Sequence, residues 1–206
     1  MLWFGLALLT AVLGLLIYWL LVVTEGLYLG RRVVVWLYDL TAHKYDCIKE
    51  FDPEAEQFFL IRPLVVRLRH IPNPLVLDVA TGTGRLPHFL LEEATFNGRI
   101  VGLDASGKML QLAREKLRPY GHRASLVQQT AVPLPFPSNL FDLVTCLEAL
   151  EFFPSDTAAL REMVRQKVND DAVDAIGMPA DEIVLAQPNS VLKTSSGKIR
   201  RNACRD

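Results

Sequence analysis

The feature that most constrains the fold of this chain is a short apolar run followed at once by glycines. The run reads LVLDV from Leu75 and is typical of a buried parallel strand, and the next residues are ATGTG. Gly82 and Gly84 allow the backbone to turn sharply and a nucleotide to approach it closely. A helix expected in RLPHFLLEEA would direct its amide groups toward that ligand. This order predicts an α/β fold with a nucleotide-binding turn, and an ordinary structural turn is the alternative.

The elements after this turn repeat the same alternation. RIVGLD, Arg99–Asp104, is a second buried strand that ends in an acid, and Ser106 is placed to cap the helix in SGKMLQLAREKL. ASLVQQ predicts a third strand, and FDLVTCLEAL contains a fourth. Strands that alternate with helices favour a parallel sheet with helices on both faces. The predicted fold class is therefore α/β, with four parallel strands.

An acidic residue about 20 positions after a glycine turn can accept hydrogen bonds from ribose hydroxyls. Asp104 stands 20 residues after Gly84, at the end of the second strand. The dinucleotide pattern GxGxxG needs a third glycine, whereas this turn continues with Arg85, Leu86 and Pro87. The sequence thus indicates a ribose-containing nucleotide without the full dinucleotide pattern.

Three motifs together have a family likeness. VLDVATGTGR, VGLDASGKML and LPFPSNLFDLVTCLEALEFF resemble those of class I S-adenosylmethionine-dependent methyltransferases, particularly the quinone and small-molecule group. The resemblance covers about residues 38–165 and implies a Rossmann-like sheet with S-adenosylmethionine as the cofactor. YDLTAHKYD, Tyr38–Asp46, looks like the segment that in this family precedes the domain and closes over the cofactor.

The resemblance implies a set of cofactor-binding residues, which are Asp78, Ala80, Gly82, Gly84, Asp104, Ala105, Met109, Thr130 and Ala131. Within this set, Asp78 and the two glycines would border the methionine part of the cofactor, and Asp104 would hold the ribose. Ala105 and Met109 would lie beside the adenine. The family often has an acidic residue before the alanine in QxDA, and this chain has Thr130 there. The contact with the adenine amino group is therefore expected to be weaker.

A methyltransferase of this kind needs little chemistry from the protein, because the sulfonium carries the reactive methyl group and the fold supplies placement. Glu148 and Glu151 follow the fourth strand, where the family's acceptor pocket begins, and His43 is another candidate base. A solvated helix start is the alternative for both glutamates. The other histidines stand singly and the three cysteines form no CxxC pair, so no metal site or disulfide is expected.

The first 24 residues carry no charged side chain, and Leu2–Val23 has the length that a helix needs to cross a bilayer. A cleaved signal peptide is the alternative, but its basic start, shorter apolar core and small-residue cleavage site are not evident. The first cations are Arg31 and Arg32, so the positive-inside rule predicts a single-pass membrane protein whose catalytic domain is cytoplasmic. GRRVVVWLYDL, which follows, is either a helix on the membrane interface or a packed domain helix.

Beyond this segment the composition is that of an ordinary soluble domain. A net charge of −1 and a pI near 6.4 give no global attraction to nucleic acid, so no such partner is expected. The expected partners are the membrane, through the N-terminal helix, and a small-molecule or lipid acceptor. The sequence does not indicate an oligomeric state.

From about residue 167 the chain does not continue the methyltransferase pattern. IGMPADEIVLAQPNSVLKTSSGKIRR looks like the end of an adenylate-forming enzyme, most closely a fatty acyl-AMP ligase. That resemblance would place Lys198 against an acyl carboxylate and an AMP phosphate, and a basic solvated tail is the alternative. We expect a fusion near Arg165–Val168 and a short α+β tail, in which DEIVLAQ, Asp181–Gln187, is able to pair with the fourth strand.

The predicted organisation has four parts. They are a transmembrane anchor in 1–24, a juxtamembrane and N-terminal helical cap in 25–72, a truncated methyltransferase cofactor-binding domain in 73–166, and the ligase-like segment in 167–206. The expected function is that of a membrane-anchored methyltransferase acting on a small or lipid-soluble acceptor, quinone-like or lipid. A non-catalytic membrane-anchored remnant or interaction module, and a fragment of an acyl-adenylate-forming ligase, are the alternatives.

Overall fold

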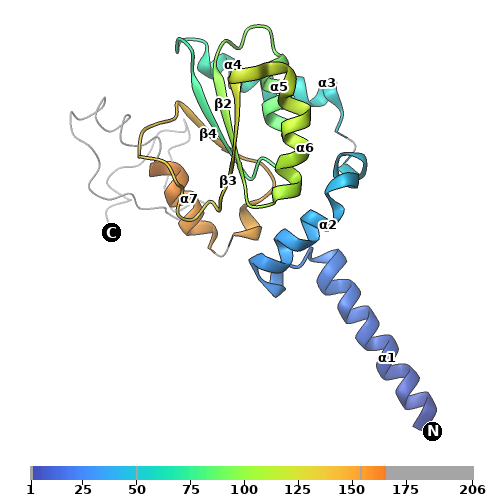
Figure 1. Ribbon diagram of the computed structural model, residues 1–206. Helices are drawn as coiled ribbons and strands as arrows, with labels where there is room; N and C mark the ends of the chain where they lie inside the picture. The colour runs from blue at the N-terminus through green and yellow to red at the C-terminus, as the bar shows by residue number, and fades with distance from the viewer. Residues whose placement is uncertain (1, 50, 154, 166–206) are drawn as a thin grey trace, which may run out of the picture.

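The computed structural model describes residues 2–49, 51–153 and 155–165 (Figure 1). Several predictions concern residues 167–206, namely the ligase-like segment, the role of Lys198, the α+β tail and the strand at Asp181–Gln187. All of them lie outside the described residues.

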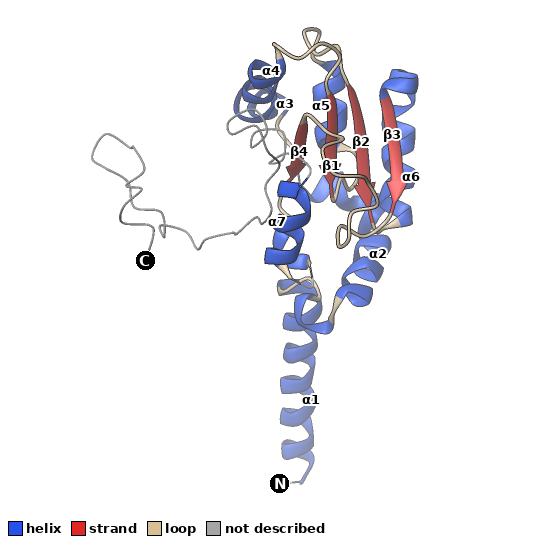
Figure 2. Ribbon diagram, turned by 90° about the vertical axis from the view of Figure 1, so that its left-hand side faces the viewer, coloured by secondary structure: helices blue, strands red, loops and turns tan. Residues whose placement is uncertain are grey.

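Four parallel strands form the centre of the domain (Figure 2). They are β1 (Leu75–Val79), β2 (Arg99–Asp104), β3 (Ala124–Gln128) and β4 (Leu143–Cys146), in the order β3-β2-β1-β4. In the register of the sheet, Val76 of β1 lies opposite Ile100 of β2 and Leu143 of β4. The arrangement confirms the predicted α/β fold with four parallel strands.

Successive side chains of β1 point to opposite faces of the sheet, and each face has its own apolar core. On one face Val76 packs in a cluster with residues of α5 (Arg85–Glu92) and α6 (Gly107–Leu117). On the other face Leu77 packs in a second cluster with residues of α7 (Asp156–Arg165). Helices therefore cover both faces of the sheet, as predicted.

Short helices complete the connections between these elements. They are α3 (Pro53–Ala55), η3 (Glu56–Ile61), α4 (Arg62–Leu68), η4 (Arg118–Arg123) and η5 (Leu150–Phe152). Of these, η3 and α4 join the first core through Ile61 and Leu68, which are both buried.

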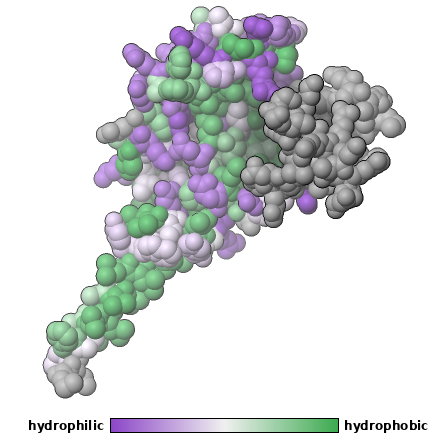
Figure 3. Space-filling view, turned by 180° about the vertical axis from the view of Figure 1, so that it is seen from behind, coloured by the Kyte–Doolittle hydropathy of each residue, from purple (hydrophilic) through white to green (hydrophobic). Residues whose placement is uncertain are grey.

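The apolar N-terminal segment is a helical stretch that projects from the domain (Figures 1 and 3). It consists of α1 (Leu2–Tyr18) and the π-helical turn η1 (Trp19–Val23). The window Trp3–Val23 has 21 residues, none of them buried in the structure, and is long and apolar enough to cross a membrane. This finding rests on length and composition.

The next long helix, α2 (Arg31–Lys49), follows the turn η2 (Leu27–Leu29) and lies against α6. Asp39 accepts a hydrogen bond from Ser106 Oγ at 2.5 Å and one from the backbone N–H of Lys108 at 3.3 Å. These contacts attach the middle of α2 to the first turn of α6.

A second set of contacts holds the later half of α2. Asp46 Oδ2 accepts a hydrogen bond from Lys116 Nζ at 2.6 Å, and its Oδ1 accepts one from Thr83 Oγ1 at 2.6 Å. Of the two interpretations of this segment, the structure shows the packed domain helix. Trp36 and Leu40 nevertheless remain more than half exposed on α2.

We predict that Gly98→Ala lowers the stability of the domain by about 1–3 kcal/mol. A Cβ atom at Gly98 would overlap with the carbonyl oxygen of Pro74 and lie 2.8 Å from Phe96 Cζ. The same Pro74 oxygen accepts the 2.8 Å hydrogen bond from Arg99 N that starts β2, so it has little freedom to move. Thermal unfolding in detergent measures the effect. Gly14→Ala is the control, because nothing lies within 4 Å of a Cβ at Gly14, and equal unfolding temperatures for the two variants would contradict the prediction.

Candidate functional site

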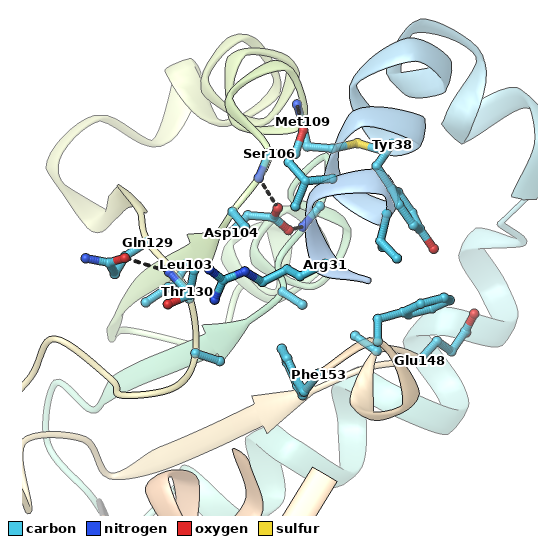
Figure 4. A pocket seen from close by; sticks show the side chains of 18 of the residues that line it. Arg31, Tyr38, Leu103, Asp104, Ser106, Met109, Gln129, Thr130, Glu148 and Phe153 are labelled. Atoms are coloured by element: carbon cyan, nitrogen blue, oxygen red, sulfur yellow. Dashed lines mark hydrogen bonds between the residues drawn. The ribbon is translucent and has the colours of Figure 1, made fainter. Parts of the chain in front are cut away.

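A pocket of about 860 Å³, including its open mouth, lies at the carboxyl ends of β1, β2 and β4 and is covered by α2 (Figure 4). Open α/β sheets bind their ligands at this edge. The loops that follow β1, β2, β3 and β4 each contribute residues to the pocket wall. The remaining wall comes from α2, the end of β2, the first turn of α6 and η5, so residues about 100 positions apart meet in one site.

The glycine turn after β1 has the backbone conformation that the sequence predicts. Gly82 and Gly84 have φ values of 55° and 78°, a region that favours glycine, and Ala80 shares it with a φ of 58°. Gly82 and Ala80 line the pocket, whereas Gly84 does not. A Cβ at Gly84 would lie 3.2 Å from Ala113 Cβ, so this glycine serves the close packing of the turn against α6.

Asp104, at the end of β2, connects two parts of the pocket. Its Oδ2 accepts a hydrogen bond from Gly82 N at 2.8 Å, and its Oδ1 accepts one from Ser106 N at 2.8 Å. Burial raises the pKa of Asp104, and these backbone hydrogen bonds partly offset the rise. The carboxylate lines the pocket and keeps lone pairs free to accept hydrogen bonds from a ligand hydroxyl.

Asp78 lies beneath the pocket and does not line it. Its side chain is buried, and Thr145 Oγ1 donates a hydrogen bond of 2.8 Å to Asp78 Oδ1. Burial raises the pKa of Asp78 to about 6. Its predicted role as a neighbour of the methionine part of the cofactor stays a prediction.

Four more residues of the predicted cofactor-binding set line the pocket, and none of them is acidic. Ala105 follows β2, Met109 lies on α6, and Thr130 and Ala131 follow β3. Thr130 Oγ1 donates a 3.3 Å hydrogen bond to the carbonyl oxygen of Val132, which leaves the hydroxyl oxygen able to accept one. The three residues that the sequence associates with the adenine, Ala105, Met109 and Thr130, therefore line the same pocket as Asp104.

Glu148 is the only candidate base that lines the pocket within the described part of the chain. It forms ion pairs with Lys49 at 3.3 Å and with Arg85 at 3.0 Å, and the hydrogen bond from Arg85 lowers its pKa. A carboxylate held in this way is a weak base at neutral pH. His43 and Glu151 are exposed and outside the pocket.

An aromatic cluster forms the wall next to Glu148. Tyr38 makes an edge-to-face contact with Phe152 at 5.8 Å between ring centroids, and Tyr45 lies 6.0 Å from Tyr38. Tyr38 also donates a hydrogen bond of 2.7 Å to Glu25, two residues after the apolar helix. Burial and this contact with Glu25 raise the pKa of Tyr38, which keeps its hydroxyl protonated.

Arg31 is a pocket residue that the sequence analysis missed as such. It begins α2, and its side chain lines the pocket, while the neighbouring Arg32 does not. No local motif marks Arg31, because its position depends on how α2 packs against α6.

Comparisons with known proteins agree with this architecture. Residues 76–167 match the model of a family described as "Methyltransferase domain". Demethylmenaquinone methyltransferase from Listeria welshimeri is 41% identical over 91 residues, which are 44% of this chain and 39% of that protein. The enzyme of the same name from Symbiobacterium thermophilum is 31% identical over 131 residues, covering 63% of this chain and 52% of that protein. The chain thus spans about half or less of the length of these relatives.

The cyclase SpnF, a solved structure, shares the fold. It aligns with a TM-score of 0.55 and 22% identity over 66% of this chain and 56% of SpnF. The domain therefore has a Rossmann-like methyltransferase fold, and S-adenosylmethionine is the cofactor that the family match supports.

The pocket residues fit this cofactor. The Asp104 carboxylate has acceptor capacity for ribose hydroxyls, and the pocket wall also includes the apolar side chains of Met109 and Ala131 and the Thr130 hydroxyl, which suit an adenine ring. An aromatic wall suits the sulfonium end, because cations are attracted to the faces of aromatic rings.

We predict that Asp78→Asn alters the pH dependence of stability. Burial raises the pKa of Asp78 from 3.8 to about 6, so between these values the folded chain holds a proton that the unfolded chain releases. The stability that Asp78 contributes is therefore complete below about pH 4 and is lost as the pH rises through about 6. Asparagine stays neutral, so the variant should gain up to about 3 kcal/mol relative to the wild type between about pH 4 and pH 7.

Chemical denaturation of both proteins across this pH range measures the difference. A difference in free energy of unfolding that stays constant with pH would show that Asp78 does not titrate in this window.

Proposed function

We propose that this chain is a membrane-anchored S-adenosylmethionine-dependent methyltransferase with a lipid-soluble, quinone-like acceptor. The observation that carries the proposal is the pocket itself. Its walls are built by the segment that matches the methyltransferase family and by α2, the long helix that follows the apolar N-terminal stretch.

The cofactor would lie along the carboxyl edge of the sheet. Asp104 accepts hydrogen bonds from its ribose, and its adenine fits between Met109 and Thr130. The methionine part runs past Ala80 and Gly82 toward the aromatic wall. The positive φ values of Ala80 and Gly82 bring the backbone close to the ligand there.

When bound, the cofactor supplies an activated methyl group for displacement, so the chain has to orient the acceptor and exclude water. Tyr38, Tyr45 and Phe152 offer aromatic surfaces against which a planar ring packs. Glu148, fixed by Arg85 and Lys49, accepts a hydrogen bond from an acceptor hydroxyl. Its lowered pKa favours positioning over proton removal.

The quinone-like acceptor is supported by two observations. The curated relatives named above are demethylmenaquinone methyltransferases. The hydrogen bond between Tyr38 and Glu25 also joins the aromatic wall to the exit of the apolar helix, so the acceptor end of the pocket lies near the expected membrane surface. The first cations after this helix, Arg31 and Arg32, favour a cytoplasmic domain.

A cofactor-binding module without transferase activity is the second candidate. It is favoured by the coverage, because this chain matches only 39% to 52% of the length of the relatives. Cofactor binding is common to both candidates, and methyl transfer distinguishes them.

We predict that Asp104→Asn weakens binding of S-adenosylhomocysteine at least about tenfold, because the amide removes half of the acceptor capacity that holds the ribose. Calorimetric titration of the detergent-solubilised chain measures the affinity, and thermal unfolding checks that the variant is folded. Glu115→Gln is the matched control, since Glu115 is exposed on α6 and outside the pocket. A folded wild-type chain that does not bind S-adenosylhomocysteine would overturn the proposed function.

The transfer step is tested with demethylmenaquinol in proteoliposomes and S-adenosylmethionine carrying a labelled methyl group. Label that enters the quinol with the wild type and not with Asp104→Asn supports the enzyme. Binding without any transfer to this acceptor favours the second candidate.

We predict that Leu9→Arg/Leu13→Arg releases the chain from membranes. Both leucines lie inside the apolar window, and each arginine near the centre of a span costs about 2.5–3.5 kcal/mol. The measurement is the fraction that resists alkaline carbonate extraction. Leu9→Ala/Leu13→Ala is the control and should stay in the membrane, and retention of the arginine variant to the same extent would argue against a spanning helix.

A further inference from the structure

Arg31 brings a positive charge into the pocket. Among the described residues that line it, Arg31 is the only cation, and the two anions are Asp104 and Glu148. In Figure 4 its side chain extends from the start of α2 across the pocket toward the side where Leu103 and Thr130 lie. This is the adenine end of the site in the proposed function.

The guanidinium of Arg31 has no partner within the described part of the chain, since no hydrogen bond or ion pair joins it to another described residue. Other cations around the site are engaged. Lys49 and Arg85 pair with Glu148, and Lys116 pairs with Asp46. Arg31 therefore offers five N–H donors and a planar face at the rim of the pocket.

The stability of α2 does not explain a cation at this position. Arg31 and Arg32 occupy the first turn of α2, which contains no acidic residue. Cations are disfavoured at a helix N-terminus by about 0.3–1 kcal/mol each, because they oppose the helix dipole. Arg31 therefore lowers the stability of the first turn of α2, and its side chain lines the pocket.

The anions of the pocket do not need Arg31 for neutralisation. Asp104 is held by two backbone N–H groups, and Glu148 already has two basic partners. At the adenine end the Thr130 hydroxyl is able to accept a hydrogen bond, and the Arg31 guanidinium, which extends toward this side, is a charged donor. The edge of adenine presents an amino donor next to a ring nitrogen acceptor, so an acceptor and a donor side by side match it.

We propose that Arg31 is a cofactor-binding residue that donates to a ring nitrogen of the adenine, while Thr130 accepts from the adenine amino group. The inference rests on the proposed function and adds to it the residues that recognise the adenine of the cofactor. A residue at the start of α2 then completes the recognition of the cofactor.

The test is a calorimetric titration of the full chain in detergent with S-adenosylhomocysteine. We expect Arg31→Ala to weaken binding at least about tenfold. Arg32→Ala is the matched control, since Arg32 has the same charge one position along α2 and does not line the pocket, and its affinity should stay within about twofold of the wild type. Arg31→Lys should lose more than half of the affinity, because an ammonium is more strongly hydrated than a guanidinium and has no planar face to lie against the base.

A second ligand shows which part of the cofactor Arg31 contacts. 5′-Methylthioadenosine has the base and ribose but neither the amino group nor the carboxylate of the amino acid part. If Arg31 binds the base, Arg31→Ala weakens both ligands by the same factor. If only S-adenosylhomocysteine is weakened, the guanidinium binds the carboxylate and the proposal is wrong.

Vesicles of phosphatidylcholine with phosphatidylglycerol test the alternative that Arg31 binds lipid headgroups. Equal loss of vesicle binding in Arg31→Ala and Arg32→Ala, with unchanged affinity for S-adenosylhomocysteine, would assign Arg31 to lipid headgroups and overturn the proposal. That outcome leaves the proposed function intact, because the wild type still binds the cofactor product. A folded wild type that binds neither S-adenosylhomocysteine nor 5′-methylthioadenosine would overturn both the proposed function and the role of Arg31.

Discussion

The carboxylate of Asp104 is the interaction on which the pocket depends. It stands at the end of a central strand and accepts one backbone hydrogen bond from Gly82 in the turn after β1 and one from Ser106 at the start of α6. Two neighbouring strand ends are thereby fixed relative to each other. This position removes the carboxylate from much of the solvent and raises its pKa. Perturbed pKa values of this kind are common among groups that bind ligands.

The helix α2 is the second constraint, because it closes the pocket that Asp104 organises. Asp39 binds the first turn of α6, and Asp46 reaches Lys116 and Thr83. These contacts cross from the N-terminal part of the chain to the cofactor domain. As a result, the segment that follows the apolar helix forms a wall of the site, and Tyr38 of that wall is hydrogen-bonded to Glu25 at the end of the apolar helix.

Much of the fold could be predicted from the sequence because its signals are local. The apolar runs gave four strands, and Ser106 caps α6 by accepting a hydrogen bond from Met109 N at 3.1 Å. The pattern around Gly82 and Asp104 placed both residues in one pocket, where the structure has them. Signals of this kind depend on spacing along the chain.

The remaining features could not be predicted because they depend on contacts between distant segments. Glu148 looked like a candidate base, but Lys49 and Arg85 meet it from other elements and lower its pKa. His43 is exposed on α2, although it follows buried Ala42, and it lies outside the pocket. In the sequence, Arg31 indicates only the orientation of the chain in a membrane. Its position at the pocket depends on how α2 packs against the domain.

We propose that α2 and the loops after β1, β2 and β3 form one cofactor pocket. Hydrogen–deuterium exchange of the full chain in detergent, with and without S-adenosylhomocysteine, tests it most directly. We expect slower exchange in four segments together, which are 31–45, 80–84, 104–109 and 129–132. Protection of the loops with no change in α2, or no protection at all in a folded chain, would contradict it.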